Sequence, residues 1–360
     1  MKKSLIALAV LAASGAAMAQ SSVTLYGVAD AGVTYLNGAD NWSGVTSGNN
    51  LTSRLGFRGV EDLGGGLKAN FVIEGGFNLD NGDGASGYAG AKAGEGFQFK
   101  RRSTVGLSGG FGEVRMGREL TAAYNATARY DVFGSVGIGQ SRLWADGGVV
   151  DASANATAVT TNQRISNALT YVSPDFSGFK FGLNYGFGET TASNSDSGYL
   201  GAGLTYDNGP LSLGLGLERL NNGANSVAAS DIDAWSLGGS YDFGVAKLLA
   251  GYRESKVDRA TGENKRLGYY VAATAPVGAG TVRVSYNRYE NELANVKGKA
   301  DQFAIGYVYG LSKRTSVYGT YAYIKNKDGA NLYTLGSSTQ GGLKNNGSQQ
   351  GVQVGVSHAF

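Results

Sequence analysis

Basic side chains are the groups in this sequence with the clearest capacity for chemistry. Alternate residues of a strand point to the same face, and on that basis twelve bases and only four acids share the face that carries small and polar side chains. Guanidinium and ammonium groups bind anions through charge-assisted hydrogen bonds. The bases are Arg54, Arg58, Lys68, Lys100, Arg102, Arg115, Arg164, Lys180, Lys247, Arg253, Arg266 and Arg283. The acids are Asp30, Glu74, Glu113 and Glu218.

The spacing of Arg54 and Arg58 is the clearest case. An i, i+4 spacing keeps both on one face of a strand, about 13 Å apart. Arg101 departs from the pattern, because alternation along the strand assigns it to the opposite face. We therefore expect it at the rim of the sheet, at a bulge or in a subunit interface. Each charge also has a purely structural interpretation, as a solvated group or a salt bridge worth about 0–1 kcal/mol.

Residues for catalysis or metal binding are scarce. The chain has one histidine, His358, and no cysteine, so a histidine-based hydrolase and a transition-metal cluster are not expected. Gly64, Gly65 and Gly66 are interpreted as turn glycines and not as a phosphate-binding loop. Scattered carboxylates leave open a Ca²⁺ at a loop. We predict no catalytic residue and no cofactor, and a net charge of +3 gives no reason to expect nucleic acid as a partner.

The last ten residues, Gly351–Phe360, predict how these charges are held. Valines and the terminal Phe360 fall on one strand face, together with His358, whereas Gln353, Gly355 and Ser357 fall on the other. An open apolar edge strand would invite aggregation in a soluble protein. In a transmembrane β-barrel the same strand closes the sheet, and its terminal ring lies at the membrane interface.

The first residues predict export. Lys2 and Lys3 precede the apolar run Leu5–Ala13 and the cleavage site Ala17-Met18-Ala19, so residues 1–19 are expected to be a cleaved secretory signal peptide. The alternative, a membrane anchor, needs about 20 apolar residues, and the run is shorter. No later segment is long and apolar enough to span, so the exported chain is either soluble or a barrel.

Connections between the predicted strands alternate strictly between short and long. Fifty-nine glycines and three prolines fit many paired strands and tight turns. Seven short turns and eight long loops predict sixteen strands. The short turns are Glu61–Gly66, Gly109–Gly112, Ser173–Gly178, Asp207–Pro210, Asp242–Val245, Pro276–Gly280 and Gly310–Arg314. The long loops are 37–52, 79–96, 118–163, 187–197, 221–231, 256–264, 292–299 and 327–347.

This alternation favours an outer-membrane barrel, whose periplasmic turns are tight and whose external loops are long. A soluble β-sandwich has no reason to make every second connection short. We therefore predict an all-β fold, a transmembrane 16-stranded antiparallel β-barrel, with residues 20–360 as its single domain. The apolar residues at alternate positions of each strand would face lipid. Tyrosines near strand ends fit an interfacial girdle, although high β-propensity would also explain their presence.

The third long loop, 118–163, is long and rich in aromatic residues. An apolar loop needs a surface to pack on, so we expect it to fold into the lumen and narrow it; an ordered external cap is the alternative. Residues 151–161 are expected to be exposed. Acids of this loop opposite the arginine wall would create a transverse field and a preference for anions. The acids are Glu119, Asp131, Asp146 and Asp151, and the loop bases are Arg118, Arg129 and Arg142.

Several motifs carry a family resemblance. Ser21–Gly32, Ser53–Gly64, Val105-Gly106-Leu107, Gly109–Gly112 with Gly117-Arg118, and the terminal Phe360 occur in an order that resembles Gram-negative general diffusion porins of the type found in β-proteobacteria. The resemblance covers the whole mature chain. The third loop departs from the enterobacterial porins, because it lacks their Pro-Glu-Phe-Gly-Gly stretch.

The resemblance implies a homotrimer in which each barrel has its own pore, narrowed by the third loop. It further implies anion selectivity through an arginine cluster, with Arg58, Arg102 and Arg164 as the members expected from position. The predicted constriction is completed by Arg54, Lys100, Arg115, Arg118, Glu119 and Asp131, with Asp30 and Glu74 as lumen acids. Phe360 is similar to the signal read by the barrel-assembly machinery. The other expected partners are outer-membrane lipid, lipopolysaccharide, and small hydrophilic solutes and anions.

Three other functions stay open at this point. A substrate-specific channel for phosphate or an organic anion would need an aromatic track, for which Tyr26, Tyr124, Tyr130 and Tyr318 are candidates. A structural barrel would have bulky paired side chains in its lumen, whereas the predicted lumen face is rich in small residues. An outer-membrane enzyme is disfavoured by the single histidine.

Overall fold

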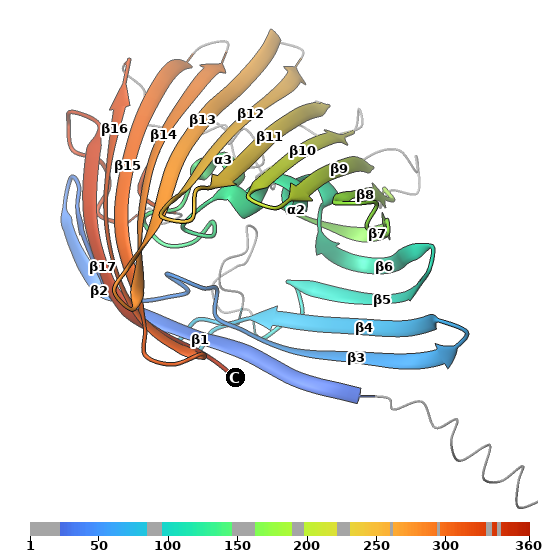
Figure 1. Cartoon of the computed structure of the whole chain (residues 1–360). Helices are drawn as coiled ribbons and strands as arrows, with labels where there is room; N and C mark the ends of the chain where they lie inside the picture. Colours follow the sequence, from blue (N-terminus) through green and yellow to red (C-terminus); the bar gives the residue numbers. More distant parts are fainter. Residues whose placement is uncertain are drawn as a thin grey trace, which may run out of the picture.

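The strands form one closed antiparallel sheet. A computed structural model of the chain describes residues 22–84, 96–145, 163–188, 198–221, 231–259, 262–293, 296–328, 333–336 and 340–360. Within them β2 and β3 both pair with β1 (Ser22–Asn37), each strand from β3 onward pairs with the next in sequence, and β17 (Ser348–Ala359) pairs back with β1. Figure 1 shows the sheet curving around a lumen that contains the short helices.

Seventeen strands occupy sixteen positions around the barrel, because β2 and β3 pair with successive halves of β1. The predicted 16-stranded barrel is therefore confirmed. The strands after β1 are β2 (Asn41–Ser47), β3 (Arg54–Gly64), β4 (Leu67–Gly76), β5 (Arg102–Gly109), β6 (Gly112–Leu120), β7 (Arg164–Val172), β8 (Phe179–Gly186), β9 (Tyr199–Asn208), β10 (Leu211–Leu220), β11 (Ile232–Asp242), β12 (Lys247–Arg259), β13 (Gly262–Val277), β14 (Gly280–Leu293), β15 (Val296–Gly310), β16 (Thr315–Lys327) and β17.

The seven predicted short turns all connect consecutive strands. Three of the predicted long loops need correction. Residues 37–52 contain β2, and the strands around 256–264 and 292–299 continue to Arg259, Gly262, Leu293 and Val296. The backbone pairing of these strands continues beyond the point where apolar and polar residues cease to alternate in the sequence.

The two faces of the barrel differ as alternation predicts. On β17, Val352, Val354 and Val356 are exposed outward, whereas Gln353 and Ser357 are buried on the inner side. The ends of the barrel are tied by the chain terminus, where the N–H of Phe360 donates to the carbonyl of Gly27 and the N–H of Gly27 donates back, both at 3.1 Å. The last strand therefore closes the barrel up to its final residue.

The third loop carries the helical segments, α2 (Ala122–Thr127), a 3₁₀ turn η1 (Ala128–Tyr130) and α3 (Arg142–Ala145). Thr121 begins α2, because its Oγ1 accepts from the N–H of Tyr124 at 3.3 Å. In Figure 1 these segments lie inside the curve of the sheet. Neither helix of the described chain has the length and apolar character required to cross a membrane.

Candidate functional site

The third loop lies inside the barrel, as predicted, and a row of inward-facing glycines receives it. A Cβ on Gly238 would collide with the ring of Tyr130, and one on Gly251 would collide with Trp144. Glycine at these positions leaves room for the loop to pack directly on the strand backbones. We did not predict from the sequence that the glycines at lumen-facing positions of the strands would receive the loop. The other members of the row are Gly203, Gly214, Gly216, Gly268, Gly306 and Gly351.

Polar side chains of the wall also hold the loop. Arg283 Nη1 donates to the carbonyl of Val132 at 3.0 Å, and its guanidinium lies 5.2 Å from the ring centre of Phe133. The N–H of Val132 donates to the Tyr270 hydroxyl at 2.8 Å, and Gln302 Nε2 donates to the carbonyl of Gln140 at 2.9 Å. The predicted lumen base Arg283 thus positions the loop.

Asp131 is buried at the centre of this loop. Its carboxylate accepts hydrogen bonds from the backbone N–H groups of Phe133, Ser135 and Ser141, each at 2.9 Å. Burial raises the pKa of Asp131 to about 6, while these N–H donors and the nearby Arg283 act in the opposite direction. We expected Asp131 to be one of the loop acids that face the arginine wall, but its carboxylate is buried and closes a turn of the loop instead.

The ionisation of Asp131 predicts a pH effect. The pKa of Asp131 in the folded loop lies above that of an aspartate in the unfolded chain. As the pH falls from 7, the folded loop therefore binds a proton at a higher pH than the unfolded chain does. In the other direction, ionisation of Asp131 as the pH rises through about 6 lowers the stability of the folded loop. Lowering the pH from 7 to 5 should raise anion preference by about twofold, since a unit charge about 10 Å away in water contributes about 0.4 kcal/mol. Reversal potentials measured at both pH values test this. An equal step in Asp131→Asn would contradict the assignment.

Most contacts of the third loop lie on β8 to β17, and the loop also reaches Leu36 of β1 and Asn49 before β3, so the wall of β3 to β6 bounds the channel together with the loop. Tyr26, Gly56, Glu74 and Arg102 are paired side by side across this wall. Glu74 is their centre. Its carboxylate accepts from the Tyr26 hydroxyl at 3.0 Å and lies 3.6 Å from Arg54 Nε.

Arg101 also binds Glu74, which corrects the prediction that it points outward. Its Nε donates to Glu74 Oε1 at 2.7 Å, and its backbone N–H donates to the Glu74 carbonyl at 3.1 Å. Arg101 precedes the first residue of β5, so strand parity does not determine its direction. The structure therefore adds Arg101 to the basic wall.

Glu119 lies on the arginine wall and not opposite to it, contrary to our expectation. It belongs to β6, where Arg115 binds both its carboxylate oxygens, with Nε at 3.1 Å and Nη2 at 2.8 Å. Arg102 Nη2 lies 3.8 Å from the same carboxylate, and Arg115 also pairs with Glu113 at 2.7 Å. The charge of Arg115 is therefore paired with two acids of its own strand. The Arg102 side chain is 32% exposed, so it is the more accessible of the two to an ion in the channel.

Arg118 and Arg164 hold the segment before β5 in place. Arg118 Nε donates to the carbonyl of Lys100 at 2.6 Å, and Arg164 Nε donates to the carbonyl of Arg101 at 2.9 Å. The pairing of β6 with β7 shifts register opposite Asn167, so Ile165 and not Arg164 takes the inward position next to Glu119. Parity therefore does not determine the direction of the Arg164 side chain, although its charge interacts with those of Arg101, Arg118 and Glu74 on the same wall.

Arg58 is the most open member of the predicted arginine cluster. It is exposed on β3, and its guanidinium lies 5.3 Å from the ring centre of Tyr26. Arg54 and Arg58 lie on the same face of β3, as their spacing predicts. Lys68 is also exposed and lies farther along the wall toward the turn that joins β3 to β4.

Asp30 does not act as an open lumen charge. It has no exposed surface and accepts from the N–H of Asn49 at 2.8 Å and from the Tyr318 hydroxyl at 2.8 Å. Glu218 is similarly buried and binds Arg253 at 2.5 Å. Within the described ranges no group of three histidine or acidic residues is arranged to hold a metal ion. Asp146 and Asp151, and residues 151–161 as a whole, lie outside the described residues.

Comparison with known proteins places this arrangement in a family. The sequence matches the Gram-negative porin family over residues 5–329. It is 45% identical to the outer membrane porin protein 32 of Delftia acidovorans over the full length of both chains. It is 34% identical to an outer membrane porin protein of Bordetella pertussis, over 91% of this chain and 95% of the relative.

A solved structure agrees with these sequence matches. The anion-selective porin from Comamonas acidovorans superimposes with a TM-score of 0.82 at 42% sequence identity, and the match covers 95% of this chain and all of that one. The fold, the third loop inside the barrel and the sequence matches lead to one conclusion: the chain is an outer-membrane protein that belongs to the Gram-negative porin family.

Proposed function

We propose that this porin is a passive channel for small hydrophilic solutes that favours anions. The observation that carries the proposal is the charge of the wall that the third loop leaves uncovered. Arg54, Arg101 and Arg102 lie there around Glu74, and Arg58 lies beside Tyr26. The other carboxylate near these arginines, Glu119, is already held by Arg115. A water-filled lumen with low-dielectric walls strengthens the field of such charges, so chloride is favoured over potassium.

The relatives support this assignment. The solved structure with a TM-score of 0.82 is described as an anion-selective porin, and its match extends over the whole barrel. The mature chain itself is nearly neutral, because removal of Lys2 and Lys3 with the signal peptide leaves a charge of about +1 from the precursor's +3. Selectivity therefore depends on where the charges lie and not on net charge.

Conductance in a planar bilayer tests the proposal. We expect large ohmic steps and, in a KCl gradient, a reversal potential with the sign of anion permeation. A reversal potential of zero or of cationic sign would reject anion preference. An absence of conductance from folded protein would favour a structural barrel instead.

A substrate-specific channel is less well supported by the tyrosines. Tyr130 is buried between the third loop and Gly238, and Tyr318 is buried against Asp30. Tyr26 is held by Glu74. These three side chains serve separate structural contacts, and the fourth candidate, Tyr124, packs against the buried cluster of the third loop, so the contacts of the four tyrosines give an aromatic track no support. A saturable current at low solute concentration would reverse this preference.

We further propose that the chain is exported by cleavage after Ala19 and assembles as a homotrimer. Amino-terminal sequencing that begins elsewhere than Gln20 would reject the cleavage site. A monomeric mass in mild detergent would reject the trimer. The proposed role of Phe360 as a signal for the barrel-assembly machinery predicts that Phe360→Ala lowers the amount of folded porin in cells but refolds normally in detergent.

Lipopolysaccharide is the lipid partner that the outward face supports. At the external end of the sheet Asp301 binds Arg288 at 2.6 Å and Lys327 at 2.6 Å, and Lys299 lies 3.7 Å from Glu290. Bases therefore outnumber acids in this outward cluster, and the phosphates of lipopolysaccharide would complement the excess. Purification in detergent tests the proposal, since Lys327→Gln should retain less lipopolysaccharide than the natural protein.

A further inference from the structure

The third loop is attached to the barrel wall in two halves. Its first half, α2 with η1, packs mainly on β8 to β11, and its second half, which ends in α3, packs on strands from β12 onward. In the first half, Thr127 Oγ1 lies 2.9 Å from Ser236 Oγ, and the Tyr130 hydroxyl lies 2.9 Å from Ser212 Oγ. The two halves therefore depend on different sets of contacts.

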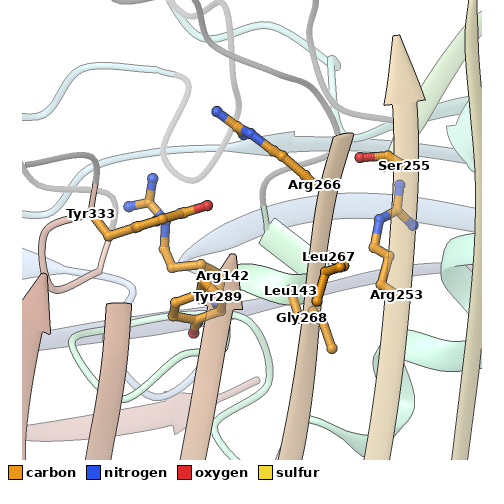
Figure 2. A pocket seen from close by; sticks show the side chains of 9 residues that line it. All are labelled: Arg142, Leu143, Arg253, Ser255, Arg266, Leu267, Gly268, Tyr289 and Tyr333. Atoms are coloured by element: carbon orange, nitrogen blue, oxygen red, sulfur yellow. Dashed lines mark hydrogen bonds between the residues drawn. The ribbon is translucent and has the colours of Figure 1, made fainter. Parts of the chain in front are cut away.

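The second half is held by buried contacts between neutral groups. Tyr289 and Trp144 are both buried. The backbone N–H of Arg142 donates to the Tyr289 hydroxyl at 2.8 Å, and the rings of Tyr289 and Tyr333 stack with their centres 5.0 Å apart. Figure 2 shows Arg142 and Leu143 beside Tyr289 on the wall. Contacts of this kind respond little to the salt concentration in the channel, because salt screens charges.

The first half ends in a charged attachment. Arg129 lies in the last turn of η1, and its guanidinium binds both carboxylate oxygens of Asp207 on β9. Nη1 donates to Oδ2 at 3.1 Å, Nη2 donates to Oδ1, and Nη2 also donates to Ser212 Oγ at 2.7 Å. A guanidinium that meets a carboxylate through two nitrogens fixes direction as well as distance. The pair therefore fixes the end of η1 on β9 and β10.

This ion pair is accessible to water, unlike the contacts of α3. The side chain of Arg129 is 38% exposed, and that of Asp207 is 46% exposed. Asp207 lies where β9 leads into the short turn before β10, so the pair is at the periplasmic end of the lumen. The loop leaves β6 at the opposite, external end, after Leu120. Arg129 thus holds the deepest part of the first half, where dissolved salt reaches the pair.

The wall behind α2 and η1 leaves them one direction of movement. A Cβ on Gly203 or Gly214 would collide with a backbone carbonyl of α2, so the helix already lies directly against the strands. When the ion pair opens, the end of η1 has room only on the side away from β9 and β10. That side is the channel, which the basic wall of β3 to β6 bounds. The bases of that wall repel Arg129 and so favour its paired position.

We propose that Arg129 is a positioning residue that keeps the periplasmic half of the channel open, by holding η1 against β9 and β10 through Asp207. With the ion pair formed the passage is wide, and with the pair broken η1 narrows it. The balance between the two positions depends on salt, because the pair is exposed. The inference rests on the proposed function, since only a conducting channel distinguishes the two positions.

Single-channel recording in planar bilayers compares two variants that each remove one positive charge from the periplasmic end of the lumen. Arg129→Gln should increase the fraction of time in a low-conductance state about fivefold, which corresponds to about 1 kcal/mol. Lys180→Gln is the matched control, because Lys180 belongs to β8 and not to the loop, and pairs with Asp175 at 3.2 Å. It should leave that fraction unchanged within about twofold.

Exchange of the two charges tests the pair directly. Arg129→Glu places an acid beside Asp207 and opposite the basic wall, so it should favour the low-conductance state more strongly than Arg129→Gln. Adding Asp207→Arg restores an ion pair of reversed direction and should return the fraction to within about twofold of that of the natural protein. Raising KCl from about 0.1 M to about 1 M shortens the screening length from about 10 Å to about 3 Å. The low-conductance fraction should then rise in the natural protein but not in Arg129→Gln.

Equal low-conductance fractions in the natural protein and in Arg129→Gln, or no recovery in the exchanged pair, would overturn the positioning role. Should a variant not fold, the natural protein decides alone, because a fraction that does not change with KCl also overturns it. Failure of the proposed function looks different, since it gives the natural protein a zero or cationic reversal potential or no conductance.

Discussion

Replacing Arg58 and Arg102 by glutamate should reverse the ion preference of the channel. Both side chains lie on the uncovered wall, and both are partly open to the lumen. The double variant changes the local charge by four units. A unit charge about 7 Å from an ion in water contributes about 0.6 kcal/mol, so the energy of a passing chloride rises by about 2 kcal/mol. This exceeds the 1.4 kcal/mol or so that changes a permeability ratio tenfold.

The reversal potential in a KCl gradient measures this effect, and a charge-matched control separates it from net charge. Arg219→Glu with Arg314→Glu makes the same change in total charge, at an exposed residue on the outward face of β10 and at the turn 310–314. The control should keep its anion preference. If the two double variants behave alike, the selectivity does not arise at the wall of β3 to β6.

Replacing Gly238 by alanine should lower the conductance, because the third loop must move toward the channel. The added Cβ would lie less than 3.0 Å from the ring of Tyr130, closer than real Cβ contacts. Overpacking of this kind costs about 1–3 kcal/mol. The ring cannot move into the sheet, so η1 shifts toward the uncovered wall and narrows the passage. Single-channel conductance and thermal unfolding in detergent measure the two consequences.

The neighbouring residue provides a matched control. Gly239 faces outward, where an added Cβ lies 3.0 Å from the end of the flexible Leu213 side chain and at an ordinary contact distance of 3.4 Å from the Ser212 carbonyl, so Gly239→Ala should keep both conductance and stability. Tyr130→Ala removes the colliding ring, and combining it with Gly238→Ala should abolish the effect of the glycine change. Additive effects in this double-mutant cycle would show that Gly238 and Tyr130 are not coupled.

The sequence by itself determined the barrel. A strand in a membrane barrel meets hydrocarbon on one face and the lumen on the other, so alternation is written into each segment of about ten residues. Short turns such as Gly109–Gly112 and the closing strand that ends at Phe360 are equally local features, and the structure confirms them. The inward position of the third loop followed from its apolar composition.

The tertiary structure alone decided how the site is built. Parity gives a direction only inside a regular strand, so it does not determine the directions of Arg101, which precedes β5, and Arg164, which is separated from the rest of β7 by a register shift. The residue type alone also does not show whether a carboxylate is exposed to solvent or buried. Asp30 is closed by N–H donors of the segment before β3 and by the Tyr318 hydroxyl, Asp131 is closed by N–H donors of the folded third loop, and the path of that loop follows glycines on many strands. These properties depend on contacts between distant residues, which no local pattern records.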